Sequence, residues 1–215
     1  MYATLETQPD ISYAVAALSC YNSRPFTSHI TADKRVLRYL KFKGNFYLHF
    51  NRNGIDIDIA NSLVGYTDSG WANDSMDCKS QGGHVFPVSN EPISWQSWKR
   101  SLIAMTTLQA EFIACSVASR EAKWLLQLQN NIHDKDSPPL PINCENQGAL
   151  TVITTGIIKA RTKLIDVCYH NSQDLHTRRI VNYCYIHTDK NVADILTNAL
   201  TEDKHTKFTR AMGLW

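Results

Sequence analysis

Four carboxylates are the residues of this chain that are best placed to carry chemistry. Asp68 follows the apolar run LVGYT and Glu145 follows the run LPINC, so each stands at the end of a predicted strand. Glu111 lies within the apolar stretch TTLQAEFIACSV, and Asp194 lies within VADILTNAL. Burying a carboxylate such as Glu111 on an apolar helix is costly unless a cation or hydrogen bonds compensate its charge.

Each of the other three carboxylates also has a structural interpretation, which we favour when it is considered singly. Asp68 suits a turn, Glu145 suits a helix cap, and Asp194 suits the first turn of a helix, where the macrodipole favours an acid. Considered together, two strand ends and two helices can bring four carboxylates to one edge of a sheet. Such a cluster repels itself unless hard divalent cations neutralise it. Two cations about 4 Å apart stabilise the attacking and leaving oxygens of phosphodiester hydrolysis, which is the chemistry that this pattern predicts.

Without metal, the clustered acids should raise one another's pKa values, most strongly at the most buried member. We expect that member to be Glu111, because its neighbours on the helix are the most apolar.

The elements that position these residues follow an α/β order. Hydrophobic periodicity predicts strands over residues 55–59, 63–67, 82–88, 93–98, 140–144 and 180–187. It predicts helices over residues 107–131, 147–154, 163–176, 191–200 and 203–212. Consecutive strands indicate a meander, and the alternating part indicates parallel strands with crossover helices. The expected fold is a mixed sheet flanked by helices.

The N-terminal part has a different character. Residues 11–21 predict a short buried helix, and residues 28–43 predict an amphipathic helix with five basic residues and one acid. The sequence NRNG at residues 51–54 is a turn signal. We therefore predict two parts, a short helical appendage over residues 1–52 and an α/β domain over residues 53–215.

Composition places the chain among ordinary globular proteins. Its 215 residues are 43% hydrophobic and 20% charged, and no apolar run approaches the roughly 18 residues that a membrane helix needs. No signal-peptide pattern is visible at the N-terminus, so we expect an intracellular protein, cytoplasmic or nuclear, that is neither secreted nor bound to a membrane. Six dispersed cysteines without a C-x-x-C pair then predict free thiols. The net charge of +2 is too small to indicate nucleic acid by itself.

A series of motifs resembles the C-terminal part of the Pol polyprotein of copia-type LTR retrotransposons. In chain order they are TQPDISYAVAALSCY, KRVLRYLK, VGYTDSGWANDSMDCKS, GGHVF, ISWQSWKR, QAEFIA, CENQGAL, ARTKLIDVCYH and VADILTNAL. The resemblance covers nearly the whole chain, and it implies the end of a reverse transcriptase followed by a ribonuclease H domain. It implies a ribonuclease H-like mixed five-stranded sheet and an endonuclease that cleaves the RNA strand of RNA–DNA hybrids. It also implies two Mg²⁺ or Mn²⁺ ions, a reverse transcriptase polymerase domain as partner, and no small-molecule cofactor.

The family's Asp-Glu-Asp-Asp ligand set maps onto Asp68, Glu111, Glu145 and Asp194. Glu145 stands where the family has an aspartate, and its extra methylene moves a carboxylate by roughly 1 Å, whereas catalytic geometry tolerates about 0.5 Å. Gly70 stands where the family has a second aspartate in its first motif. Two functions therefore stay open, an active ribonuclease H and a catalytically silent retrotransposon fragment that at most binds nucleic acid.

Several basic residues are candidates for contacts with the phosphate backbone, which set affinity rather than sequence preference. They are Lys99, Arg100, Lys159, Arg161 and Lys163, together with Lys34, Arg35 and Arg38 on the predicted N-terminal helix. For that helix, a solvated basic face is an equally good interpretation.

Two minor alternatives concern histidines. Residues 168–187 contain a group of possible zinc ligands with spacings that match no standard zinc finger, namely Cys168, His170, His176, Cys184 and His187. His187 precedes Asp194, and cellular ribonucleases H carry an auxiliary histidine in that loop, so His187 is a weak candidate for the same role.

Overall fold

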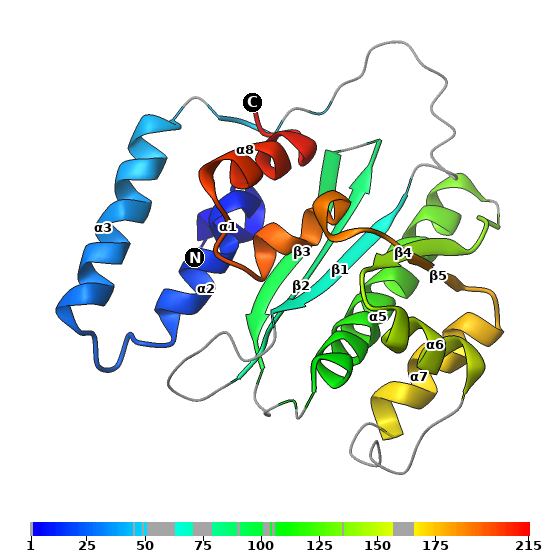
Figure 1. Ribbon diagram of the computed structural model, residues 1–215. Helices are drawn as coiled ribbons and strands as arrows, with labels where there is room; N and C mark the ends of the chain where they lie inside the picture. Colours follow the sequence, from blue (N-terminus) through cyan, green and yellow to red (C-terminus); the bar gives the residue numbers. More distant parts are fainter. Residues whose placement is uncertain are drawn as a thin grey trace.

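The computed structural model describes residues 2–44, 46–48, 50, 63–70, 79–89, 91–100, 104, 106–134, 136–156 and 166–215, side chains excepted for residues 166–169. Figure 1 shows how its helices and strands are arranged. The N-terminal part contains α1 (Tyr2–Glu6), the 3-10 helix η1 (Pro9–Ile11), α2 (Ser12–Ser19) and α3 (Thr27–Phe42). The strands are β1 (Gly65–Gly70), β2 (Gln81–Val88), β3 (Glu91–Lys99), β4 (Leu140–Cys144) and β5 (Val181–Tyr185). The other helices are α5 (Thr107–His133), α6 (Gln147–Thr155), α7 (Asp166–Thr177), the 3-10 helices η3 (Thr188–Lys190) and η4 (Val192–Leu196), and α8 (Glu202–Ala211).

The five strands form one mixed sheet in the order β3-β2-β1-β4-β5. β1, β2 and β3 are antiparallel neighbours, whereas β4 runs parallel to β1 and β5 runs parallel to β4. The long helix α5 connects the edge strand β3 to β4, and α6 and α7 connect β4 to β5. This arrangement confirms the predicted α/β fold, a ribonuclease H-like mixed sheet flanked by helices.

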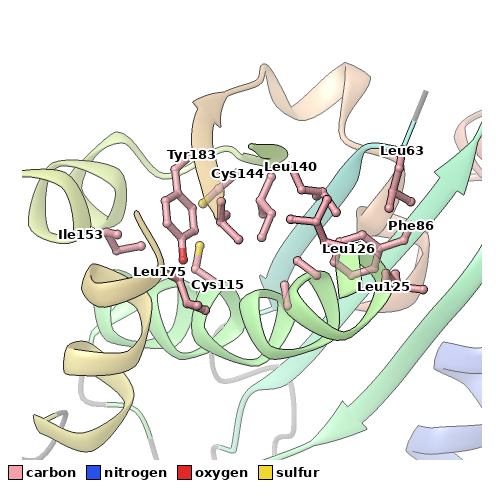
Figure 2. Close-up of a cluster of buried hydrophobic side chains, with 14 of the residues drawn as sticks. Leu63, Phe86, Cys115, Leu125, Leu126, Leu140, Cys144, Ile153, Leu175 and Tyr183 are labelled. Atoms are coloured by element: carbon pink, nitrogen blue, oxygen red, sulfur yellow. The ribbon is translucent and has the colours of Figure 1, made fainter. Parts of the chain in front are cut away.

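Two apolar clusters hold the helices on the two faces of the sheet. Successive side chains of a strand point to opposite faces, so Phe86 and its neighbour Val85 on β2 belong to different clusters. Phe86 belongs to the cluster drawn in Figure 2, which also contains residues of α5, such as Phe112, and residues of β4, β5, α6 and α7. Val85 packs with Ile195 of η4 and Phe208 of α8. The α5 face and the η4 face therefore lie on opposite sides of β1 and β2.

The N-terminal segment packs on the sheet and on α8. α2 contacts β3, and Trp95 of β3 donates from its Nε1 atom to the carbonyl oxygen of Thr4 at 2.7 Å. His205 Nε2 of α8 lies 3.1 Å from the carbonyl oxygen of Asp10. The Asp10 carboxylate accepts a hydrogen bond of 2.5 Å from the hydroxyl of Tyr39 on α3. α3 itself has no buried residue and lies at one side of the molecule (Figure 1).

The structure differs from the sequence-based expectation at three elements. Asp68 lies inside β1 and not in a turn after it. The predicted buried helix over residues 11–21 is shorter, and its residues after Ser12 are only half-buried. The predicted helix over residues 191–200 is only the short 3-10 helix η4, which is capped and tied to the sheet by Asn191. Its Oδ1 accepts from the amide of Ala193 at 3.3 Å, and its Nδ2 donates to the carbonyl of Thr67 at 3.1 Å.

Two other expectations fall outside the described residues. These are the strand over residues 55–59 and the boundary at residues 51–54, so the division into residues 1–52 and 53–215 stays a prediction. In the described part of the chain, no helix combines the length and the apolarity that a membrane span requires.

Candidate active site

Three carboxylates from three different elements meet at one point of the structure. Asp68 comes from β1, Glu111 from the second turn of α5, and Glu145 from the residue after β4. One oxygen of each lies within 4.8 Å of the others. Among the described side chains, this is the one group of three or more His, Cys, Asp or Glu residues whose ligand atoms lie so close together.

A glycine opposite Asp68 allows η4 to lie directly on the sheet. Asp68 of β1 pairs with Gly83 of β2. A Cβ atom added to Gly83 would lie 2.7 Å from Cβ of Leu196 and 2.8 Å from Cγ2 of Thr197. This close approach brings the Thr197 hydroxyl to the Asp68 carboxylate, to which it donates a short hydrogen bond.

Asp194 joins the neighbourhood through a shared hydrogen-bond donor. Nδ2 of Asn198 lies 2.6 Å from Oδ1 of Asp194 and 3.3 Å from Oδ2 of Asp68. The second oxygen of Asp194, Oδ2, accepts a hydrogen bond of 2.5 Å from Nζ of Lys204 on α8. The four carboxylates singled out in the sequence are therefore neighbours, but Asp194 lies outside the group of three that share one centre.

Burial changes the protonation of the two innermost carboxylates. It raises the pKa of Asp68 to about 7; the charges of Glu145 and Asp194 add to this effect, and the Thr197 hydrogen bond opposes it. Burial also raises the pKa of Glu111 well above its usual range, and the negative charge of Asp68 adds to the shift. The direction is the one expected, but Asp68 is the most buried member, 2% exposed against 4% for Glu111, because η4 covers it.

Glu145 provides an independent indication that the cluster suits a cation. Its Oε2 atom is buried and has no hydrogen-bond partner among the described residues. A buried oxygen without a donor is unfavourable, and carboxylate oxygens are the ligands that Mg²⁺ and Mn²⁺ prefer. The three convergent carboxylates therefore fit a divalent cation by charge and by donor type.

Two free thiols lie beside the carboxylates. Sγ of Cys144 lies 3.8 Å from Oε2 of Glu111 and accepts a hydrogen bond of 3.4 Å from the amide of Asn146. Figure 2 shows Cys115 of α5 and Cys144 of β4 next to the ring of Tyr183. The described cysteines are free, as predicted, and they are Cys20, Cys115, Cys144 and Cys184.

Arg100 does not have the role expected for it. Its side chain is 7% exposed, and its guanidinium donates to the carbonyl of Ala110 and lies 3.4 Å from Oγ of Ser69. Its positive charge opposes the rise in the pKa of Glu111. Arg100 is therefore buried against Ser69 and Ala110, the chain neighbours of Asp68 and Glu111, and is not available to a phosphate group at the surface.

The other predicted basic residues divide into two groups. Lys99 is half-exposed at the end of β3, and the α3 residues are exposed, namely Lys34, Arg35 and Arg38. The remaining three lie outside the described residues, namely Lys159, Arg161 and Lys163.

The described histidines do not support the zinc alternative. His187 is exposed, caps η3 and lies 3.5 Å from the carboxylate of Asp189. His176 lies against Tyr183 and within 3.4 Å of the carbonyl of Val181. Among the described residues, neither histidine belongs to a group of three or more converging metal-ligand atoms.

Thr197 and Lys204 bind two of the carboxylates, and neither was predicted from the sequence as a site residue. Asn198 follows Asp194 by four residues, so helical spacing alone can connect those two. Lys204 lies on another helix, ten residues beyond Asp194, and no local pattern indicates the contact.

Comparisons with known proteins agree with the motifs. No protein-family model matches the chain. The retrovirus-related Pol polyprotein from transposon TNT 1-94 of Nicotiana tabacum is 33% identical over 216 residues, which cover 100% of this chain and 16% of the polyprotein. That from transposon RE2 of Arabidopsis thaliana is 31% identical over 208 residues, which cover 97% of this chain and 14% of the polyprotein. Among solved structures, the N-terminal RNase H domain of rv2228c from Mycobacterium tuberculosis superposes with a TM-score of 0.48 at 15% identity, over 69% of this chain and 96% of that one.

Proposed function

The chain belongs to the Pol polyproteins of copia-type transposons, in their ribonuclease H region, and we propose that it hydrolyses the RNA strand of RNA–DNA hybrids. The chain spans about one sixth of the length of these relatives. Its place in retrotransposon reverse transcription, with a reverse transcriptase polymerase domain as partner, is therefore part of the proposal.

One observation carries the proposal. Asp68, Glu111 and Glu145 come from β1, α5 and the end of β4, and their oxygens converge within 4.8 Å. The buried charges oppose folding, as the raised pKa values of Asp68 and Glu111 indicate. Proteins commonly keep such unfavourable arrangements where function requires them.

The three converging carboxylates would hold Mg²⁺ or Mn²⁺, with Asp194 at the margin of the site. When bound, such a cation stabilises the charge that develops on the phosphate oxygens during hydrolysis. The chain's other residues fix the ligands. Thr197 and Asn198 donate to Asp68 and hold its carboxylate in one orientation, and the charge of Arg100 opposes the rise in the pKa of Glu111.

Substrate binding would use positive charge at the surface. Lys99 and the exposed face of α3, with Lys34, Arg35 and Arg38, are the described candidates. Contacts of this kind neutralise phosphates without reading the base sequence, which suits an enzyme that acts on hybrids of any sequence.

Hydrolysis of a labelled RNA–DNA hybrid by the purified chain tests the proposal. We expect cleavage of the RNA strand that is weak with Mg²⁺ and stronger with Mn²⁺, because Mg²⁺ requires stricter octahedral geometry. Asp68→Asn should abolish cleavage, since it removes a charged ligand. Glu145→Asp should raise the rate by about 10- to 100-fold if the longer side chain misplaces a ligand by roughly 1 Å.

The second candidate function is a catalytically silent fold that binds nucleic acid. The longer Glu145 side chain favours it, as does the engagement of both Asp194 oxygens by donors of the chain. If Glu145→Asp cleaves no faster than the Asp68→Asn control with either metal, while the chain still binds the hybrid, the catalytic proposal is overturned and the silent fold stands.

A further inference from the structure

The fourth carboxylate of the site is engaged by a positive charge that the chain itself provides. Nζ of Lys204 lies 2.5 Å from Oδ2 of Asp194. The Asp194 side chain is 7% exposed and that of Lys204 is 27% exposed, so the ion pair is partly shielded from water. An ion pair of this kind is screened less by salt than a pair on the surface.

Neither oxygen of Asp194 is left without a donor. Asn198 donates to Oδ1 at 2.6 Å, while Lys204 donates to Oδ2. Glu145 differs, because its buried Oε2 atom has no partner among the described residues. An oxygen that still lacks a donor or a cation therefore lies in the group of Asp68, Glu111 and Glu145. Both oxygens of Asp194 already have donors from the chain.

An ammonium group and a divalent cation compete for the same carboxylate. Both are positive, so a cation placed on Asp194 would be repelled by the Lys204 charge a few ångströms away, in surroundings that screen it weakly. The cation would also have to displace hydrogen bonds that Asp194 already accepts.

We propose that the Lys204 ammonium takes the place of a second cation, so that the chain binds a single divalent ion, at Asp68, Glu111 and Glu145. The resemblance to ribonucleases H implies two ions, and this inference changes that number for the present chain. It rests on the metal site of the proposed function, but it concerns the number of ions and not the cleavage reaction.

The number of bound Mn²⁺ ions per chain tests the inference without a measurement of activity. Calorimetric titration gives the stoichiometry, and electron paramagnetic resonance distinguishes an isolated Mn²⁺ ion from two ions that share carboxylates and are magnetically coupled. We expect one ion per chain and an uncoupled spectrum for the unmodified protein.

Substitution of Lys204 should change the stoichiometry. Lys204→Met removes the charge at similar length, and we expect a second Mn²⁺ ion and a coupled spectrum. Lys204→Arg keeps the charge, and we expect one ion. Lys207→Met is the matched control, because Lys207 also lies on α8, with Nζ 5.6 Å from the Phe208 ring centroid, as Lys204 Nζ is. Lys207 binds the carbonyl of Asp189 instead of a site carboxylate, so its loss should leave one ion.

Three outcomes overturn the inference. Two coupled ions in the unmodified chain overturn it directly, and so does a single ion in a folded Lys204→Met variant. If Lys204→Met does not fold, as judged by circular dichroism, Lys204→Gln replaces it with the same expectation. Absence of Mn²⁺ binding in every variant overturns the metal site as well. One bound ion without hybrid cleavage leaves the inference standing and contradicts only the proposed function.

Discussion

Burial of the charged Asp68 carboxylate lowers the stability of the folded protein when no cation is bound. Its pKa of about 7 means that the folded state retains a proton that the unfolded chain loses near pH 4. Stability that comes from this proton is present at low pH and is lost as the pH rises from about 4 to about 7. In EDTA at pH 8, Asp68→Asn should therefore be more stable than the unmodified chain, by about 2–4 kcal/mol or several degrees in Tm.

Thermal unfolding in EDTA at pH 5 and pH 8 measures this effect. The Tm difference between Asp68→Asn and the unmodified chain should be larger at pH 8, since groups that titrate in both proteins cancel. Asp33→Asn is the control, because Asp33 is exposed on α3 and lies outside the cluster. An Asp68→Asn variant that is less stable than the unmodified chain at pH 8 would contradict the buried-charge explanation. Addition of Mn²⁺ should stabilise the unmodified chain more than the variant.

For single residues, the four acids could be identified from the sequence, but the side chains that donate hydrogen bonds to them could not. Glu111 was identifiable because a carboxylate on an apolar helix has few structural explanations. Lys204 and Thr197 carry no such signal, since a lysine or a threonine on a predicted helix is ordinary, although the structure buries Thr197 completely. Arg100 was predicted to contact phosphate for the same reason. Nothing in the sequence KRS indicates that the arginine side chain points inward, to the carbonyl of Ala110.

At the scale of elements, the contact between β2 and η4 determines where the carboxylates meet. Gly83→Ala would place a Cβ atom 2.7 Å from Leu196 and 2.8 Å from Thr197, so η4 must move away from the sheet. We expect a loss of about 1–3 kcal/mol in the free energy of unfolding, as for overpacked cores. Because Thr197 and Asn198 directly follow η4 and donate to Asp68, Mn²⁺ affinity should also fall.

Calorimetric Mn²⁺ titration and denaturant unfolding measure the two effects. Gly44→Ala is the matched control, because the nearest atoms to its added Cβ are 3.6 Å away, at an ordinary contact distance. If Gly83→Ala weakened neither stability nor Mn²⁺ affinity, the close packing of η4 on β2 would not position the site.

The elements themselves were predicted well where periodicity is strong. β2, β3, α5 and α6 begin and end within two residues of their predicted bounds, and in α5 and α6 the buried residues recur at helical spacing. η4 was predicted as a longer helix, but it ends at Leu196, and Thr197 directly after it donates a hydrogen bond to Asp68, 129 positions away. A contact of that range has no local signature, so no helical pattern could reveal the early end.

For the whole molecule, connectivity predicted a mixed sheet of antiparallel and parallel strands, but it did not predict the position of the N-terminal segment. A meander followed by crossover helices restricts the sheet to few arrangements, and the observed order is one of them. The N-terminal helices, by contrast, pack on β3, η4 and α8, and hydrogen bonds between residues far apart in the sequence join them to these elements. Trp95 with Thr4 and His205 with Asp10 are two of these hydrogen bonds, and they follow from no repeating pattern.

These contacts predict that the N-terminal segment and the sheet unfold as one unit. Tyr39→Phe removes the hydroxyl that donates to the Asp10 carboxylate, which is 3% exposed. A buried carboxylate that loses its donor costs about 1–3 kcal/mol, and because Asp10 also meets His205 of α8, the whole molecule should melt at a lower temperature in one transition. Hydrogen exchange should quicken in both η1 and α8.

Tyr47→Phe is the control, since Tyr47 is 61% exposed and its change should stay within about 0.5 kcal/mol. Two separate transitions, with the loss of stability confined to the N-terminal helices, would mean that the appendage folds independently of the sheet.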